Sequence, residues 1–145
     1  CIHTTAATED AAARAQWTTF DLQHGLPRLP ASQVEHWTPQ QLGLERLAAF
    51  SVKKGCYPGQ EIVARTHFLG QTKRTASLLH TSHPLTAGDD VCDQQQHSFG
   101  KVVACCDALA MAVLPAQMQA EGIDNPLFVG DHRVQPVAFM GGLQR

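Results

Sequence analysis

Hydrophobic and polar residues alternate over residues 72–81, and short β-favouring runs separated by turn residues follow along the rest of the chain. Alternation with a period of two places successive side chains on opposite faces of a strand, and Pro84 and Gly88 mark turns between such runs. Strands are therefore expected at residues 72–81, 90–93, 98–107, 108–114, 127–129 and 133–139. Short, closely spaced strands of this kind predict a small antiparallel β-barrel. Within it, the adjacent Cys105 and Cys106 should point to opposite faces.

The first half of the chain has a helical pattern instead. Thr8 is a plausible N-cap, with acids following it in the first turn, and Gly25-Leu26-Pro27 should end the helix. Ala13, Trp17 and Phe20 recur at i, i+4 and i+7, so they share one face, which we interpret by default as core.

A second short helix is expected after residue 37. Thr38-Pro39-Gln40-Gln41 has the form of a capping box, with Thr38 as the cap and Gln41 at the third helical position. Leu42, Leu44 and Leu47 would be the apolar positions of this helix. Residues 26–37, with two prolines, read as an irregular connection.

Reactive and charged side chains are most concentrated in the sequence around Cys56. Pro58 favours a helix start, and the helix should run to about Leu69 and be closed by Gly70. Cys56 would then precede the helix, where free N–H groups, the dipole and Lys53 and Lys54 favour a thiolate.

Each part of this stretch has a plainer alternative. Most free cysteines are small buried hydrophobic residues. Glu61 and Arg65 are four apart, a spacing typical of a surface helix pair. The glycines Gly55 and Gly59 are also typical of a tight turn. Physical reasoning alone therefore identifies a candidate site and no reaction.

Composition excludes some classes of protein. The chain has 145 residues, of which 43% are hydrophobic and 17% charged, with a formal net charge of −2, as in ordinary globular proteins. No apolar run reaches the length of a membrane span and no secretory signal is visible, so we expect a cytoplasmic protein without a membrane partner. Because the chain starts at Cys1 in what reads as mid-domain sequence, we expect it to be part of a longer protein.

Cysteine, histidine and charge patterns refine this picture. The five cysteines form no C-x-x-C and the eight histidines no H-x-x-x-H, so neither a disulfide framework nor a protein-only metal site is indicated. A cluster of cations between residues 53 and 74 fits either an anionic partner or a solvated helix face. The cations are Lys53, Lys54, Arg65, Lys73 and Arg74.

The stretch from Lys54 to Arg65 closely resembles the signature K-G-C-[YF]-x-G-Q-E-x-x-x-R of the YgfZ family, folate-binding proteins related to the glycine-cleavage T-protein (GcvT, an aminomethyltransferase). The matching residues are Lys54, Gly55, Cys56, Tyr57, Gly59, Gln60, Glu61 and Arg65. Upstream, Trp17, Gly25-Leu26-Pro27 and Thr38-Pro39-Gln40 fall where the family has W, G-I-P and P-Q. Downstream, Gly70 and Lys73-Arg74 match its G-x-x-K-R.

The resemblance implies an α+β fold in two parts. Residues 1–71 would be the helical remainder of a GcvT-like folate-binding domain carrying the motif, and residues 72–145 a C-terminal antiparallel β-barrel. The N-terminal half of the family's folate-binding domain is missing from this sequence.

The resemblance also implies a function. Family members bind tetrahydrofolate or a folate derivative and help assemble or repair iron–sulfur enzymes, including ones that modify tRNA, and a mitochondrial iron–sulfur assembly factor belongs to the group. Their activity depends on the motif cysteine, here Cys56, with transient contact to an iron–sulfur species possible. Trp17 stands where a family tryptophan stacks on folate, and Lys53, Lys54 or Arg65 would meet the folate's anionic tail.

This sequence departs from the family pattern at one position, which in the related T-protein contacts the pterin ring of folate. The family's R-I-E-A-G-I-P glutamate is replaced by Gln23, which can hydrogen-bond a pterin but brings no negative charge. The leading hypothesis is an accessory protein that acts by binding rather than by turnover, with folate and iron–sulfur client enzymes or assembly proteins as partners. The alternatives are a T-protein-like aminomethyltransferase and an RNA-binding module that uses the cation cluster.

Overall fold

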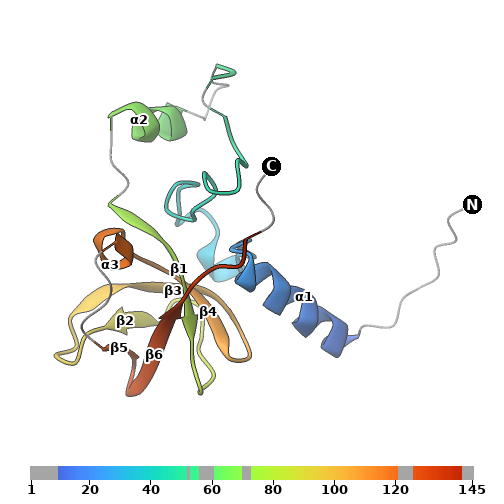
Figure 1. Ribbon diagram of the computed structural model, residues 1–145, viewed down its shortest axis with the longest axis vertical. Coiled ribbons are helices and arrows are strands. Elements are labelled where there is room, and N and C mark those ends of the chain that lie inside the picture. Colours follow the sequence, from blue (N-terminus) through green and yellow to red (C-terminus); the bar gives the residue numbers. More distant parts are fainter. Residues whose placement is uncertain (1–9, 52, 56–60, 70–72, 121–125, 142–145) are drawn as a thin grey trace, which may run out of the picture.

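Six antiparallel strands close into a barrel in the second half of the chain (Figure 1). The computed structural model describes residues 10–51, 53–55, 61–69, 73–120 and 126–141. The strands are β1 (Arg74–His80), β2 (Asp90–Cys92), β3 (Ser98–Cys106), β4 (Leu109–Pro115), β5 (Leu127–Val129) and β6 (His132–Val137). Each lies within about two residues of a predicted strand, so the small antiparallel barrel read from the alternation is confirmed.

The strand order around the barrel is β1-β4-β3-β2-β5-β6, and β1 pairs with both β4 and β6. In the closing pair Leu78 is opposite Val137 and His80 is opposite Gln135. Every described strand therefore has a hydrogen-bonded neighbour on both sides.

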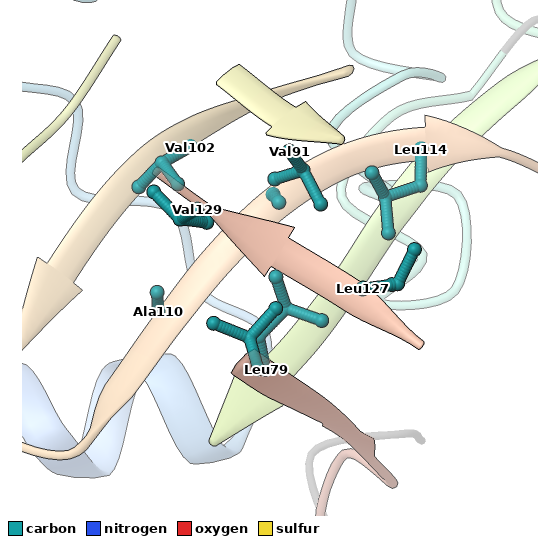
Figure 2. Close-up of a cluster of buried hydrophobic side chains, with 9 residues drawn as sticks. Leu79, Val91, Val102, Ala110, Leu114, Leu127 and Val129 are labelled. Carbon is teal, nitrogen blue, oxygen red and sulfur yellow. The ribbon is translucent and has the colours of Figure 1, made fainter. Parts of the chain in front are cut away.

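The barrel interior is filled by aliphatic side chains (Figure 2). Leu79, Val91, Val102 and Leu114 have no measurable exposure, and they converge from four strands. Burial of such side chains contributes about 1.5–3 kcal/mol each, so this cluster is the main source of the barrel's stability.

A β-bulge in β3 decides which way its cysteines point. The register with β4 shifts between Val102 and Ala104, so Val103 and Ala104 both face outward. Alternation then resumes: Cys105 packs against the interior cluster, and Cys106 against the outer cluster beneath the first helix. The prediction that the two cysteines point to opposite faces is confirmed.

The helix α1 (Ala11–Gln23) lies against the outside of β3 and β4 (Figure 1). Its N-cap is Asp10 rather than Thr8, which lies outside the described residues. The Asp10 carboxylate accepts hydrogen bonds from the N–H groups of Ala12 and Ala13 at 3.0 and 3.1 Å, which stabilises the first turn. The helix ends at Gln23, just before the predicted stop at Gly25-Leu26-Pro27, and the φ of +69° at Gly25 suits glycine.

The interpretation of the Trp17 face as core is wrong for the described part of the chain. Trp17 is 62% exposed and Phe20 39% exposed, whereas Leu22 is 1% exposed and packs between Leu78 and Met111. The barrel-facing side of α1 carries small residues such as Ala15, and small side chains allow the helix to approach the strands closely.

The segment 38–48 has the predicted cap but not the predicted helix. Thr38 and Gln41 form the capping box, since the Thr38 N–H donates to Gln41 Oε1 at 2.9 Å and the Gln41 N–H donates to Thr38 Oγ1 at 3.3 Å. A string of turns follows, because Gly43 and Ala48 adopt positive φ and stop helical propagation. We call residues 38–48 the turn segment.

Three short elements complete the fold. A 3₁₀ helix, η1 (Ala31–Gln33), interrupts the predicted irregular connection, and α3 (Gln117–Ala120) follows β4. The helix of the motif region, α2 (Glu61–Leu69), starts at Glu61. The predicted domain boundary at residue 71 lies outside the described residues. In the parts of the chain that the structure describes, no helix is both long and apolar enough to cross a membrane.

Candidate functional site

The turn that leads into the motif is exposed. Lys53, Lys54 and Gly55 all face solvent, and the Lys53 N–H donates to Ser51 Oγ at 3.3 Å. Gly55 has a φ of +82°, and among the described residues no atom beyond its chain neighbours lies within 4 Å of where a Cβ would be. Glycine is therefore suited to this position by its backbone conformation and not by crowding.

The centre of the motif lies outside the described residues. This applies to Cys56, Tyr57, Gly59 and Gln60, so the ionised thiol remains a prediction. Glu61 is the first residue of α2 and Arg65 lies one turn later, both exposed. A carboxylate in the first helical turn interacts favourably with the positive end of the helix dipole.

A buried glutamine holds α2 in place. Gln40 is 5% exposed, and its Nε2 donates to the carbonyl oxygen of Val63 at 2.8 Å. Its other amide atom, Oε1, is the one buried side-chain polar atom of the described residues that has no hydrogen-bond partner. Leaving such an acceptor unpaired costs about 1–3 kcal/mol, so a further hydrogen-bond donor at this oxygen would stabilise the protein.

An arginine in the same turn segment holds the end of α1. Arg46 Nη2 donates to the carbonyl oxygen of His24 at 2.5 Å, and its guanidinium lies 4.8 Å from the centroid of Phe139. Partial burial lowers the pKa of Arg46 from its usual value. A Cβ on Gly25 would collide with this guanidinium, so Gly25 is required for close approach as well as for its φ.

Gln40 and Arg46 together connect three stretches singled out by the sequence. The turn segment joins three stretches: residues 24–27, which we call the Gly25 corner, the Pro39-Gln40 pair, and the helix of the cysteine motif. Neither side chain was selected from the sequence as a site residue. Gln40 was noted within the capping box and the P-Q match, and no local pattern indicates that it is buried.

The exposed face of α1 carries an aromatic row. The rings of Trp17 and Phe20 meet edge to face at 5.9 Å, and the Phe20 and His24 rings are 4.1 Å apart. Gln23 is half-buried, and its carbonyl oxygen accepts a hydrogen bond from the Met140 N–H at 2.8 Å. The contacts described for Trp17 and Gln23 do not join them to Lys53 or Lys54, so these predicted site residues form two groups.

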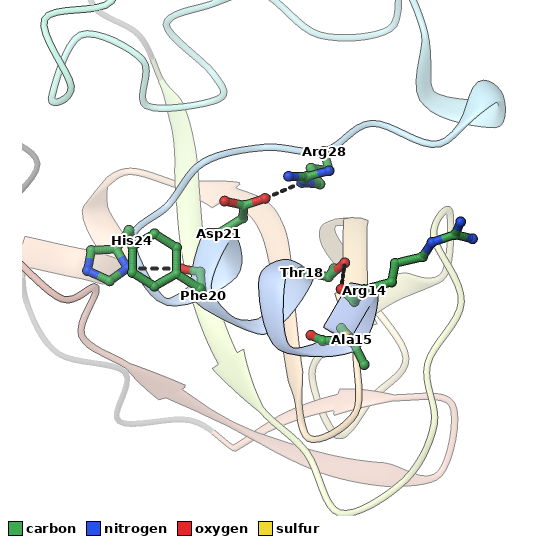
Figure 3. A network of polar contacts seen from close by, with 8 residues as sticks. Arg14, Ala15, Thr18, Phe20, Asp21, His24 and Arg28 are labelled. Atoms are coloured by element: carbon green, nitrogen blue, oxygen red, sulfur yellow. Dashed lines mark hydrogen bonds and ion pairs between the residues drawn. The ribbon is translucent and has the colours of Figure 1, made fainter. Parts of the chain in front are cut away.

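A buried carboxylate on α1 is a further feature that the sequence did not reveal. Asp21 is 6% exposed and forms an ion pair with Arg28 Nε (Figure 3). The pair fixes the chain directly after the Gly25 corner and orients the Arg28 guanidinium, whose side chain remains 63% exposed.

The predicted cations are accessible to solvent. Lys53, Lys54, Arg65, Lys73 and Arg74 are all exposed. No group of three or more His, Cys, Asp or Glu side chains in the described ranges is placed to hold a metal ion. Cys92, Cys105 and Cys106 are free thiols, and burial raises the pKa of Cys92 and of Cys105. No protein-family model matches the chain.

Proposed function

We propose that this chain is the C-terminal portion of a YgfZ-like accessory protein that serves iron–sulfur enzymes, including tRNA-modifying ones. In this proposal residues 1–71 are the remainder of a GcvT-like folate-binding domain. The eight-position match from Lys54 to Arg65 is its sequence basis. The observation that carries it is the linkage made by Gln40 and Arg46, because it ties three motif segments distant in sequence into one unit.

Tetrahydrofolate fits the groups that this chain offers. A pterin has flat faces that stack on aromatic rings and N–H groups that need acceptors. Trp17 offers an exposed indole, and Gln40 a buried amide oxygen that lacks a donor. Trp17 and Gln40 would hold the pterin, and Lys53 the anionic tail, with Gln23 as a second amide. A bound tetrahydrofolate supplies one-carbon carrier chemistry.

The role of the thiol follows from its neighbours. Cys56 follows Lys53 and Lys54 and precedes the start of α2 by five residues. Nearby cations favour a thiolate, which is both a nucleophile and a ligand for iron. In our proposal this thiolate contacts either an iron–sulfur species or a sulfur atom of the client protein. The iron–sulfur species is then cargo and not a resident cofactor of this chain.

The thiol role is tested by complementation. A strain that lacks its own copy of the gene is given the full-length gene carrying either Cys56→Ala or Cys106→Ala, and the activity of an iron–sulfur enzyme is measured in extracts. We expect the Cys56→Ala strain to lose that activity and the Cys106→Ala strain to keep it. Full restoration by Cys56→Ala would refute the thiol role.

Folate binding is tested by fluorescence. The chain has two tryptophans, and a Trp37→Phe variant leaves Trp17 as the reporter. We expect 5-formyltetrahydrofolate to quench the Trp17 emission in a saturable way. A flat titration would contradict the assignment of Trp17. Steady turnover in a glycine-cleavage assay would favour the aminomethyltransferase alternative.

A further inference from the structure

Two histidine rings that have no part in the proposed function are stacked on one another beside β6. His83 lies in the loop that follows β1, and His132 is the first residue of β6. Their ring centroids are 3.7 Å apart, and the ring planes differ by 19°. We call these two side chains the histidine pair. Because the two residues are distant in sequence, no spacing of histidines along the chain indicates it.

The pairing of β1 with β6 explains why the two rings meet. His80 is opposite Gln135, and the same antiparallel register, continued beyond the end of β1, brings His83 opposite His132. Directly opposed residues of antiparallel strands have Cβ atoms about 4.5–5.5 Å apart, and their side chains project on the same side of the sheet. The closure of the barrel therefore brings the two imidazoles together.

A buried threonine anchors the backbone of His83. Thr81 is 2% exposed, and its Oγ1 accepts a hydrogen bond from the His83 N–H at 3.1 Å. The same hydroxyl donates to the His83 carbonyl oxygen at 2.9 Å, and the Thr81 N–H donates to the Ala108 carbonyl oxygen at 2.9 Å. These bonds fix one member of the histidine pair, and β6 fixes the other.

The ring nitrogens of the histidine pair are available to a ligand. Both side chains are exposed, and within the described ranges neither ring forms a hydrogen bond or an ion pair. The ring of His97 differs, because its Nδ1 lies 3.1 Å from Asp93 Oδ2. The alternation of β6 directs the neighbouring cation Arg133 to the opposite face from His132.

The separation of the two rings suits a shared metal ion. Imidazole nitrogen is a preferred ligand of Zn²⁺, Cu²⁺ and Ni²⁺. Because each metal–nitrogen bond is about 2.0–2.1 Å long, two nitrogens bound to one ion lie roughly 3–4 Å apart. The ring separation of 3.7 Å falls in that range. Rotation about χ2, which has broad preferences in histidine, turns one nitrogen of each ring toward a common point.

We propose that the histidine pair binds one divalent transition-metal ion through one nitrogen of each ring, with water completing the coordination. Such a two-residue site is smaller than the groups of three or more ligands that were sought in the described part of the chain. The bound ion connects the loop after β1 to the start of β6. Neither Cys56 nor Trp17 takes part, so this proposal and the proposed function can fail independently.

The probe for the test is Ni²⁺, which is paramagnetic and broadens the NMR signals of nearby protons. It is titrated into the full chain, prepared without a histidine tag, while the ring signals of the histidines are followed. We expect the signals of His83 and His132 to broaden together, at a Ni²⁺ concentration at least about tenfold lower than those of His36, an exposed histidine outside the pair. Broadening of His36 at the same concentration would overturn the proposal.

Competition identifies the class of ion. Zn²⁺ should restore the broadened signals, because it is also a good partner for imidazole. Mg²⁺ prefers oxygen ligands and should leave them broadened at the same concentration. Restoration by Mg²⁺ as readily as by Zn²⁺ would contradict ligation by the two rings.

Single substitutions test whether both rings hold the ion. His83→Gln and His132→Gln should each weaken Ni²⁺ binding at the remaining ring by at least about tenfold, since loss of even an outer-shell partner costs about 10–100-fold in metal affinity. His97→Gln is the matched control and should leave the binding unchanged. Circular dichroism verifies that each variant is folded. A folded His83→Gln protein whose His132 ring binds Ni²⁺ as tightly as before would refute the shared site.

Discussion

Replacing Gln40 with methionine separates its structural role from its proposed role in binding. The free protein should lose the bond from Gln40 to the Val63 carbonyl, worth about 0.5–1.5 kcal/mol. It should also be relieved of the unpaired Oε1, whose burial costs about 1–3 kcal/mol. Methionine has a similar volume, so the two effects nearly cancel. The free energy of unfolding should stay within about 1 kcal/mol of the original value.

Ligand should reveal the difference between the two proteins. On the proposed function, 5-formyltetrahydrofolate at 100 times its Kd should stabilise the original chain by about 2.7 kcal/mol. If losing the Gln40 acceptor weakens binding about tenfold, the same concentration stabilises the variant by only about 1.4 kcal/mol. Urea unfolding followed by circular dichroism, with and without ligand, measures both quantities.

The matched control is Gln33→Met. Gln33 is equally buried, but its Oε1 accepts a hydrogen bond from Trp37 Nε1 at 2.9 Å. Its replacement should destabilise the free protein by about 1–3 kcal/mol and leave the ligand-induced shift unchanged. The reasoning fails if Gln40→Met costs more than the control, or if its ligand-induced shift equals that of the original chain.

Three further outcomes follow from the barrel. Gly100→Ala should lower the free energy of unfolding by about 1–3 kcal/mol in urea titrations, because a Cβ there collides with the Val113 carbonyl oxygen. Burial raises the pKa of Cys105, so iodoacetamide should label this thiol more slowly in the folded protein than in the unfolded chain. The free energy of unfolding should fall at alkaline pH, because the Cys105 thiol ionises at a lower pH in the unfolded chain than in the folded protein. Hydrogen bonds from Lys101 and Ser98 lower the pKa of Asp90, so an NMR titration of the Lys101→Met variant should show a higher pKa for Asp90. The stability that the Asp90 carboxylate contributes is present above its pKa in the unfolded chain and is lost as the pH falls through its pKa in the folded protein.

The barrel was predictable because its signal is local. Short β-favouring runs separated by turn residues predict the strands, although β1 and β4 are buried on both faces over most of their length. Closure was less direct, since the pairing of β1 with β6 brings together residues about sixty positions apart. The bulge at Val103 was not predicted, because a single extra residue leaves the apolar character of β3 unchanged.

The orientation of α1 was predicted wrongly because the i, i+4, i+7 spacing of Ala13, Trp17 and Phe20 was taken to mark the buried face. Trp17 and Phe20 are the largest apolar residues of the helix, yet the barrel accepts the side with Ala15 and Leu22. Close packing against the strands favours small side chains on the side of α1 that faces the barrel. The spacing of apolar residues along the helix does not indicate this requirement.

The candidate site was predictable in part. The motif from Lys54 to Arg65 and the Gly25 corner are visible as sequence patterns. The side chains that connect them are not, since Gln40 reaches 23 residues ahead and Arg46 reaches 22 residues back. Such contacts depend on tertiary structure, and neither residue type indicates burial by itself.

The pairing of β1 with both β4 and β6 limits how other proteins can engage this chain. An open sheet can recruit an extended peptide as an extra strand, using the backbone groups of its outermost strand. The six described strands offer no such row of amides and carbonyls. A protein partner of the described barrel would therefore have to recognise side chains, and the aromatic row of α1 and the cations ahead of α2 present such side chains.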